Sequence, residues 1–263
     1  MPTQPIITLT TDFGVGSPYS AAMKGVILSL NPMARIVDIS HSISPQNIRQ
    51  GALALVDTTP LFPEETIHVA VIDPGVGSNR PIVYVEFPWG RYICPDNGLL
   101  GRLAERAQPT MIVSVEAEKY FRPTVAPTFH GRDIMAPVAS HLSLGLNPQE
   151  LGSPLKELKQ LDWPGVIKVA NRIEGEVVSI DSFGNLITNI SRAMLADVPT
   201  NDRVAIYCDQ HETRGIFATY SDQPSMTLMA LIGSNDHLEI AIVDDSAKIM
   251  LGIEIGTAVE VSW

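Results

Sequence analysis

Short apolar runs alternate with segments of helical periodicity through the first part of the chain. The runs have the length of buried strands and lie at residues 6–11, 35–40 and 66–72. Between them, apolar residues recur every three or four positions, which predicts helices over about 18–30 and 45–56. Each helix would begin at a serine followed by proline, a common start signal. This alternation of strands and helices predicts right-handed crossovers and a mainly parallel sheet.

The alternation continues with a predicted strand pair, a short helix, another strand and a longer helix. These elements are expected at residues 82–87, 91–94, 97–107, 111–115 and 132–144. Pro137 lies inside the last segment, so it must either kink that helix or lie in its first turn.

A connector over residues 147–166, which contains several prolines, leads into a region of different character. There, turns separate short strand-like runs, and one short helix is expected at residues 191–196. The runs lie at residues 176–180, 186–190, 203–208, 227–232, 237–243 and 258–263. Such strands are typical of a β-sandwich or barrel. We therefore predict an α/β domain over residues 1–166 and a smaller, barrel-like all-β domain over residues 167–263.

Composition narrows the class of protein. The 263 residues are 45% hydrophobic and 18% charged, as in ordinary globular proteins. A net charge of −11 argues against nucleic acid or an anionic membrane as the partner. Cys94 and Cys208 are far apart and lack metal-ligand spacing, which favours a reducing cytoplasm without a structural disulfide. We expect neither a membrane span nor a signal peptide, because no apolar run reaches about 18 residues and no basic leader is present.

Polar residues follow two of the predicted parallel strands. Asp12 comes directly after the first strand, and Asp73 follows the third, with Arg80 seven residues further on. In an open α/β sheet, the carboxyl ends of the strands are where ligands bind. The alternative is that both aspartates only shape turns and that Arg80 is solvated. The glycines after Asp73 do not form a nucleotide P-loop, because no Gly-Lys-Ser/Thr follows them.

Two further polar clusters lie in expected loops. His130 and Asp133 stand at the start of the helix near residue 132, where a structural histidine and a first-turn acid are the simpler alternatives. Residues 181–185 join two strands of the second domain and could equally form an Asx-rich hairpin turn. A metal site built from Asp12, Asp73 and the residues near 130 lacks a supporting His/Glu spacing, so none is predicted.

Seven motifs occur in order from residue 8 to about residue 245. They are Thr10-Thr-Asp-Phe-Gly14, Met23-Lys-Gly25, Val71-Ile-Asp-Pro-Gly-Val-Gly77, Pro95-Asp-Asn-Gly-Leu-Leu100, Thr128-Phe-His-Gly-Arg-Asp133, Asp181-Ser-Phe-Gly-Asn185 with Thr188-Asn-Ile190, and Leu238-Glu-Ile-Ala241. With these motifs in register, the chain resembles the S-adenosylmethionine hydrolases (hydroxide adenosyltransferases), which are relatives of the adenosyl fluorinase and chlorinase.

The resemblance implies an N-terminal α/β domain, a C-terminal β-barrel and a trimer with sites between neighbouring subunits. It implies that water attacks the ribose C5′ of S-adenosylmethionine and that adenosine and L-methionine are formed without a cofactor or metal. Asp73, Arg80 and His130 match the catalytic set. The substrate-binding residues match as Asp12 for the ribose hydroxyls and as Phe183, Asn185 and the backbone near Val243 for adenine. Asp181 and Ser234 match positions for the methionine end, and Asn235 and Glu239 are further expected binding residues. Asn235 stands where halogenases carry arginine.

The same resemblance separates water from halide as the nucleophile. Halogenases have tyrosine, threonine and serine at the positions of Asp73, Val76 and Gly131. A carboxylate at position 73 would repel a halide by several kcal/mol in a site of intermediate dielectric. Asp73 is too weak a base to make hydroxide from water, so it is expected to orient a water molecule and to accept its proton late in the attack. A halogenase, or a protein that binds adenosine or S-adenosylmethionine without turnover, remains the alternative.

Overall fold

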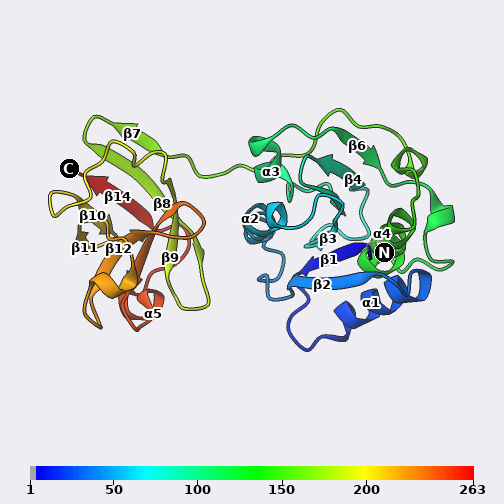
Figure 1. Ribbon diagram of the computed structural model, residues 1–263, viewed down its shortest axis with the longest axis horizontal. Coiled ribbons are helices and arrows are strands. Elements are labelled where there is room, and N and C mark those ends of the chain that lie inside the picture. The colour runs from blue at the N-terminus through cyan, green and yellow to red at the C-terminus, as the bar shows by residue number, and fades with distance from the viewer. Residues whose placement is uncertain (1–3) are drawn as a thin grey trace. The chain divides into compact units, whose positions relative to one another are not determined.

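The computed structural model describes residues 4–263, which form two compact units, residues 4–161 and 162–263 (Figure 1). The division falls a few residues before the boundary expected near residue 166. Within the described residues, no helix has the length and apolar character needed to cross a membrane.

The first unit contains a six-stranded sheet with strand order β2-β1-β3-β5-β4-β6. The strands are β1 (Ile6–Thr11), β2 (Arg35–Ser40), β3 (Ile67–Val71), β4 (Ile82–Phe87), β5 (Gly90–Pro95) and β6 (Met111–Ser114). The pairs β1–β2, β1–β3 and β3–β5 are parallel, whereas β4 runs antiparallel to both β5 and β6. The predicted mainly parallel sheet is therefore confirmed.

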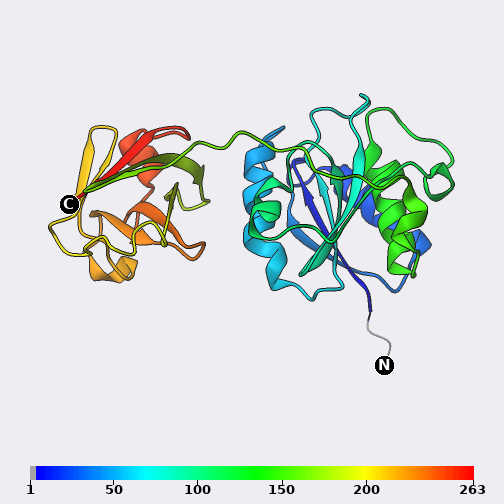
Figure 2. The ribbon, with the colours of Figure 1, turned by 90° about the horizontal axis from the view of Figure 1, so that it is seen from above.

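Helices cover both faces of this sheet, which Figure 2 shows between them. On one face, α1 (Pro18–Leu30) packs against α4 (Ala136–Ser143) over a core that includes Leu9 and Val69. On the other face, α2 (Ile48–Thr58) packs against α3 (Gly101–Arg106). Short 3-10 helices occur at Thr59–Leu61, Glu118–Tyr120 and Pro148–Leu151. Consecutive buried strand residues point to opposite faces, so each strand contributes to both helical layers.

The predicted start of α1 is confirmed, but that of α2 is wrong. Ser17 caps α1, and its hydroxyl accepts from the Tyr19 N–H. For α2 the cap is Asn47, whose side chain accepts from the Gln50 N–H at 2.9 Å, so the helix begins after the serine–proline pair at 44–45. Asparagine caps as well as serine does, and the positive φ of Gln46, 64°, keeps the preceding residues out of the helix.

Two other helix predictions need correction. The helix expected from residue 97 begins only at Gly101, because the Asn97 side chain donates to the Ile72 carbonyl and accepts from the Leu99 N–H. The helix expected over 132–144 is a π-helical turn, Gly131–Met135, followed by α4. Pro137 lies in the first turn of α4, and the Asp133 carbonyl, four residues before it, accepts from the Arg122 N–H at 2.9 Å instead.

The second unit contains an eight-stranded antiparallel sheet that curves into a nearly closed barrel, which confirms the predicted all-β class. Its strands are β7 (Ile167–Val169), β8 (Arg172–Ile180), β9 (Leu186–Ser191), β10 (Ala205–Cys208), β11 (His211–Arg214), β12 (Leu228–Ile232), β13 (His237–Ile242) and β14 (Ala258–Ser262). The long strand β8 pairs with β14 along its first half and with β9 along its second, and its pairing shifts between Val177 and Ser179.

Sequence patterning missed some of these elements. The helix expected at residues 191–196 is wrong: Ser191 ends β9, and residues 192–196 form consecutive turns in which Arg192 pairs with Asp236. The short strands β7 and β11 were not expected. A one-turn helix, α5 (Ala247–Leu251), capped by Ser246, was not expected either.

Candidate active site

Adjacent parallel strands bring two of the predicted carboxylates to the same sheet edge. Thr11 at the end of β1 pairs with Val71 at the end of β3, so Asp12 and Asp73 leave the sheet side by side. Both line a cavity of about 290 Å3 whose opposite wall includes His130 and Gly131. The sheet register therefore brings together residues that are far apart in the sequence.

Asp12 is held from one side by a backbone donor. The N–H of Gln46 donates to its Oδ2 at 2.8 Å. Phe13, which also lines the cavity, packs edge-to-face against Tyr19 and Phe129. The carboxylate keeps Oδ1 and part of Oδ2 for an incoming hydroxyl donor, because an ionised carboxylate offers about four lone-pair positions.

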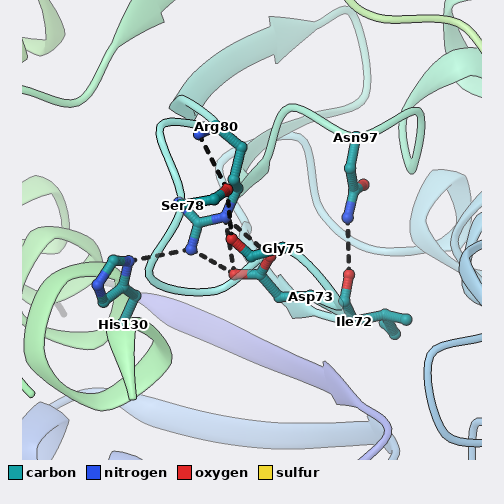
Figure 3. A network of polar contacts seen from close by, with 7 residues as sticks. All are labelled: Ile72, Asp73, Gly75, Ser78, Arg80, Asn97 and His130. Atoms are coloured by element: carbon teal, nitrogen blue, oxygen red, sulfur yellow. Dashed lines mark hydrogen bonds and ion pairs between the residues drawn. The ribbon is translucent and has the colours of Figure 1, made fainter. Parts of the chain in front are cut away.

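Asp73 and Arg80 form a bidentate ion pair (Figure 3). The guanidinium Nε lies 2.8 Å from Oδ1 and 2.9 Å from Oδ2, and one terminal nitrogen donates to Oδ2 as well. The two side chains are 5% and 11% exposed, so the pair is well shielded from water. Asp73 therefore carries a fixed charge, and its remaining acceptor capacity lies mostly on Oδ1.

The glycine-containing turn after Asp73 explains how Arg80 returns to that carboxylate. Gly77 has a φ of +80°, and a Cβ there would lie 2.7 Å from the carbonyl oxygen of Pro127. The backbone of Pro127 therefore approaches this turn so closely that only glycine fits at position 77. The Asn97 side chain also holds the carbonyl of Ile72, immediately before Asp73 (Figure 3).

His130 completes the network and is neutral. A terminal nitrogen of Arg80 lies 3.0 Å from its Nδ1. A guanidinium can only donate, so Nδ1 accepts and the imidazole proton sits on Nε2. Burial lowers the pKa of His130, the Arg80 charge lowers it further, and Asp73 and Asp133 oppose that shift only in part. The structure thus settles a protonation state that the sequence leaves open.

Asp133 has a structural role. Its buried carboxylate accepts from Arg122 and Arg132 at 2.7 Å and from the Ala126 N–H at 2.9 Å. Burial alone would raise the pKa of Asp133, but these hydrogen bonds outweigh it and lower the pKa to about 2. Both oxygens of this carboxylate are therefore occupied by hydrogen bonds, which connect Arg122 and Ala126, in the loop before His130, to the π-helical turn. Within the described residues, no group of three or more His, Cys, Asp or Glu is arranged to hold a metal ion.

The predicted residues of the second unit form a separate polar cluster. Asp181 Oδ1 accepts from the N–H groups of Phe183 and Asn185 at 2.9 Å, and its Oδ2 accepts from the Asn185 amide nitrogen at 3.0 Å. That amide nitrogen also donates to the Tyr220 hydroxyl, which in turn donates to Glu239. Both amide protons of Asn185 are therefore engaged, and its side-chain oxygen is left as an acceptor.

Tyr220 is the member of this cluster that sequence reasoning missed. Burial and its hydrogen bond to Glu239 raise the pKa of its phenol, and burial also raises the pKa of Glu239. Tyr220 lies in a one-turn helix, Tyr220–Asp222, inside a long irregular segment. Its Thr219–Asp222 capping box marks an ordered turn, but nothing in that signal indicates contact with Glu239.

The other predicted residues of the second unit lie around this cluster. Phe183 is 76% exposed at the tip of the β8–β9 turn, an unusual position for an aromatic ring. Ser234 and Asn235 form the β12–β13 turn. Val243 donates to the Thr227 carbonyl and accepts from the Met226 N–H, which leaves one lone pair of its carbonyl for a ligand.

Comparison with known proteins agrees with this architecture. Residues 7–152 match the family model of the SAM hydroxide adenosyltransferase N-terminal domain, and residues 175–260 match that of the C-terminal domain. A curated (R)-S-adenosyl-L-methionine hydrolase from Thermus thermophilus is 36% identical over 259 residues, which cover 95% of this chain and 96% of the relative. A curated fluorinase from an Actinoplanes species is 30% identical over 73% of each chain. The crystal structure of an uncharacterised conserved protein from Thermotoga maritima has a TM-score of 0.92 at 32% identity, covering 98% of this chain and 100% of that one.

The two units of this chain therefore match, in order, the two domains of a class of adenosyl-transferring enzymes. This chain belongs to the SAM hydroxide adenosyltransferase family. The resemblance drawn from the seven sequence motifs is confirmed.

Proposed function

We propose that this protein hydrolyses S-adenosyl-L-methionine to adenosine and L-methionine. The observation that carries the proposal is the Asp73–Arg80–His130 network beside a cavity that Asp12 also lines. The name of the Thermus thermophilus relative, a hydrolase of this substrate, supports the same reaction. A non-catalytic binding role is less favoured, because the charged network is intact.

The reaction requires little acid–base chemistry. A water oxygen attacks the ribose C5′, the C5′–S bond breaks, and its electron pair leaves on a neutral thioether, so no general acid is needed. The water proton passes to Asp73, which lines the cavity and keeps spare acceptor capacity on Oδ1. Arg80 and neutral His130 keep that carboxylate in place. Catalysis then rests mainly on a positioned water molecule in near-attack geometry.

Halide is disfavoured by the packing around Gly131 as well as by the carboxylate of Asp73. A Cβ at Gly131 would lie 3.1 Å from a Val71 methyl group and 3.3 Å from the Met23 sulfur. The serine that the resemblance places here in halogenases therefore has no room in this chain unless Val71 shifts. Together with the fixed negative charge of Asp73, this arrangement favours water over chloride or fluoride.

Substrate contacts follow from the atoms left free in each unit. Asp12 accepts from the ribose hydroxyls, and the free Asn185 oxygen accepts from the adenine amino group while Phe183 stacks on the ring. Asp181 and Ser234 bind the methionine end, with Asn235, Glu239 and Val243 around them. The name of the relative also specifies the (R) sulfonium epimer, so we extend the proposal to that epimer as the preferred substrate.

We expect the reaction to need no metal or cofactor. Chelator-treated protein incubated with each purified sulfonium epimer should form adenosine, which chromatography follows, at a rate that added Mg2+ or Zn2+ does not change. Absence of adenosine above the uncatalysed rate would refute the hydrolase. Formation of 5′-chloro- or 5′-fluoro-adenosine in the presence of halide would point to the halogenase instead.

We further propose a cytoplasmic homotrimer with the substrate site between subunits. The proposed ribose and water contacts belong to the first unit and the proposed adenine and methionine contacts to the second, and one substrate must reach both sets. Light scattering of the active protein should give three times the chain mass of 28.5 kDa. A fully active monomer would contradict this assembly.

A further inference from the structure

A second polar network lies beneath Asp12 and takes no part in the chemistry described above. The Thr11 hydroxyl lies 2.8 Å from His41 Nδ1, and His41 Nε2 lies 3.1 Å from Asp38 Oδ1. The other oxygen of Asp38 pairs with Lys24. The chain of contacts therefore runs from α1 through the end of β2 to the end of β1.

The order carboxylate, imidazole, hydroxyl is that of a nucleophilic triad, but the burial of the hydroxyl excludes that role here. Thr11 is fully buried and does not line the cavity at Asp12. A nucleophile must reach its substrate, so this hydroxyl cannot act as one. The network must act on the neighbouring backbone.

That backbone carries Asp12. The Thr11 hydroxyl accepts from the Phe13 N–H at 3.3 Å, and the His41 carbonyl accepts from the Gly14 N–H at 2.8 Å. His41 therefore contacts the chain on both sides of Asp12. Its side chain reaches the Thr11 hydroxyl, and its carbonyl accepts from the Gly14 N–H. The Thr11 hydroxyl accepts from the Phe13 N–H and is free to donate to His41 Nδ1, whereas His41 Nε2 lies within ion-pair distance of Asp38 without the geometry of a hydrogen bond.

We infer that His41 is a positioning residue for substrate binding: with Asp38 and Lys24 behind it, it orients Asp12 toward the ribose diol. This inference rests on the proposed function for the identity of the ligand. It gives a role to Lys24, which lies in the Met23-Lys-Gly25 motif and is outside the cavity. Gln46 restrains the Asp12 carboxylate itself, and the His41 network restrains the backbone that carries it.

The test compares two ligands that differ only in the diol. Calorimetry measures the Kd of adenosine and of 2′,3′-dideoxyadenosine for the full chain. Thr11→Val replaces the hydroxyl with a methyl group, and we expect it to weaken adenosine binding about tenfold, the effect of roughly one hydrogen bond, while dideoxyadenosine binding stays unchanged. Thr11→Ser keeps a hydroxyl and should restore the parental preference. Asp12→Asn, measured in the same way, gives the change in the ratio of the two Kd values when recognition of the diol is lost.

Asp38→Asn provides a variant at the exposed end of the network, where unfolding is not expected because the Asp38 side chain is 40% exposed. It should reduce the preference for adenosine in the same direction, whereas His141→Phe, a change on the remote helix α4, should not. In turnover assays, KM should rise with kcat changed by less than about threefold. An unchanged preference in both Thr11→Val and Asp38→Asn, or a parent protein that does not distinguish the two ligands, would overturn the inference. An inactive parent that still distinguishes them would refute only the hydrolase.

Discussion

Replacing Asp73 by asparagine should lower kcat by about 100-fold or more, the usual scale for loss of a general base, with a much smaller effect on substrate affinity. Asparagine keeps the size of the side chain but removes the charge that accepts the water proton and pairs with Arg80 in two places. Single-turnover kinetics on the full chain, followed by adenosine formation, separate the chemical step from binding and product release.

Asp96→Asn is the matched control for this prediction. Asp96 follows β5 at the same sheet edge, but its carboxylate accepts from the Lys159 N–H and does not line the cavity. The control should keep kcat within about twofold of the parent. Near-parental turnover of Asp73→Asn would show that the Asp73–Arg80–His130 network is a structural support, and the water would then have to be held by other groups.

Replacing Asp133 by asparagine should destabilise the first unit by about 2–4 kcal/mol near neutral pH. The carboxylate is fully buried, while its partners Arg122 and Arg132 are 42% and 30% exposed. Removing one member of a buried charged pair costs about 3–5 kcal/mol, and the lower value applies here because both arginines can regain water. Urea denaturation of parent and variant, followed by circular dichroism, measures the difference in unfolding free energy.

The pH dependence of this difference distinguishes charge from packing. The folded pKa of Asp133, about 2, lies below its ordinary value of 3.8, so its stabilising contribution is complete above pH 4 and is lost as the pH falls toward 2. The gap between parent and Asp133→Asn should shrink over that interval. Glu105→Gln, which breaks an exposed pair with Arg102 on α3, should cost less than about 1 kcal/mol at any pH. A gap that stays constant down to pH 2 would assign the loss to packing.

Local sequence signals sufficed wherever a single segment determines its own structure. The strands β1 to β6 lie within a residue or so of their predicted positions, because a buried strand needs an unbroken apolar run and a helix needs periodicity. The start of α1 was predictable from Ser17 and Pro18. Before α2 the sequence offers two capping residues within four positions, and the structure shows that Asn47 caps the helix by accepting from the Gln50 N–H.

The sequence by itself determined the two fold classes, the family and the candidate residues, because apolar periodicity and ordered motifs are properties of the chain alone. Only the tertiary structure decided how those residues are arranged and which of them are in contact. The parallel register of β1 and β3 places Asp12 beside Asp73, and the donor-only guanidinium of Arg80 makes His130 neutral. The side-chain contacts of Asp133 assigned it to structure, and longer-range contacts identified Tyr220 and His41 as further members of the polar networks. Tyr220 and Glu239 are 19 positions apart, and Thr11 and His41 are 30 apart. Hydrogen bonding over such separations leaves no periodic pattern in the sequence.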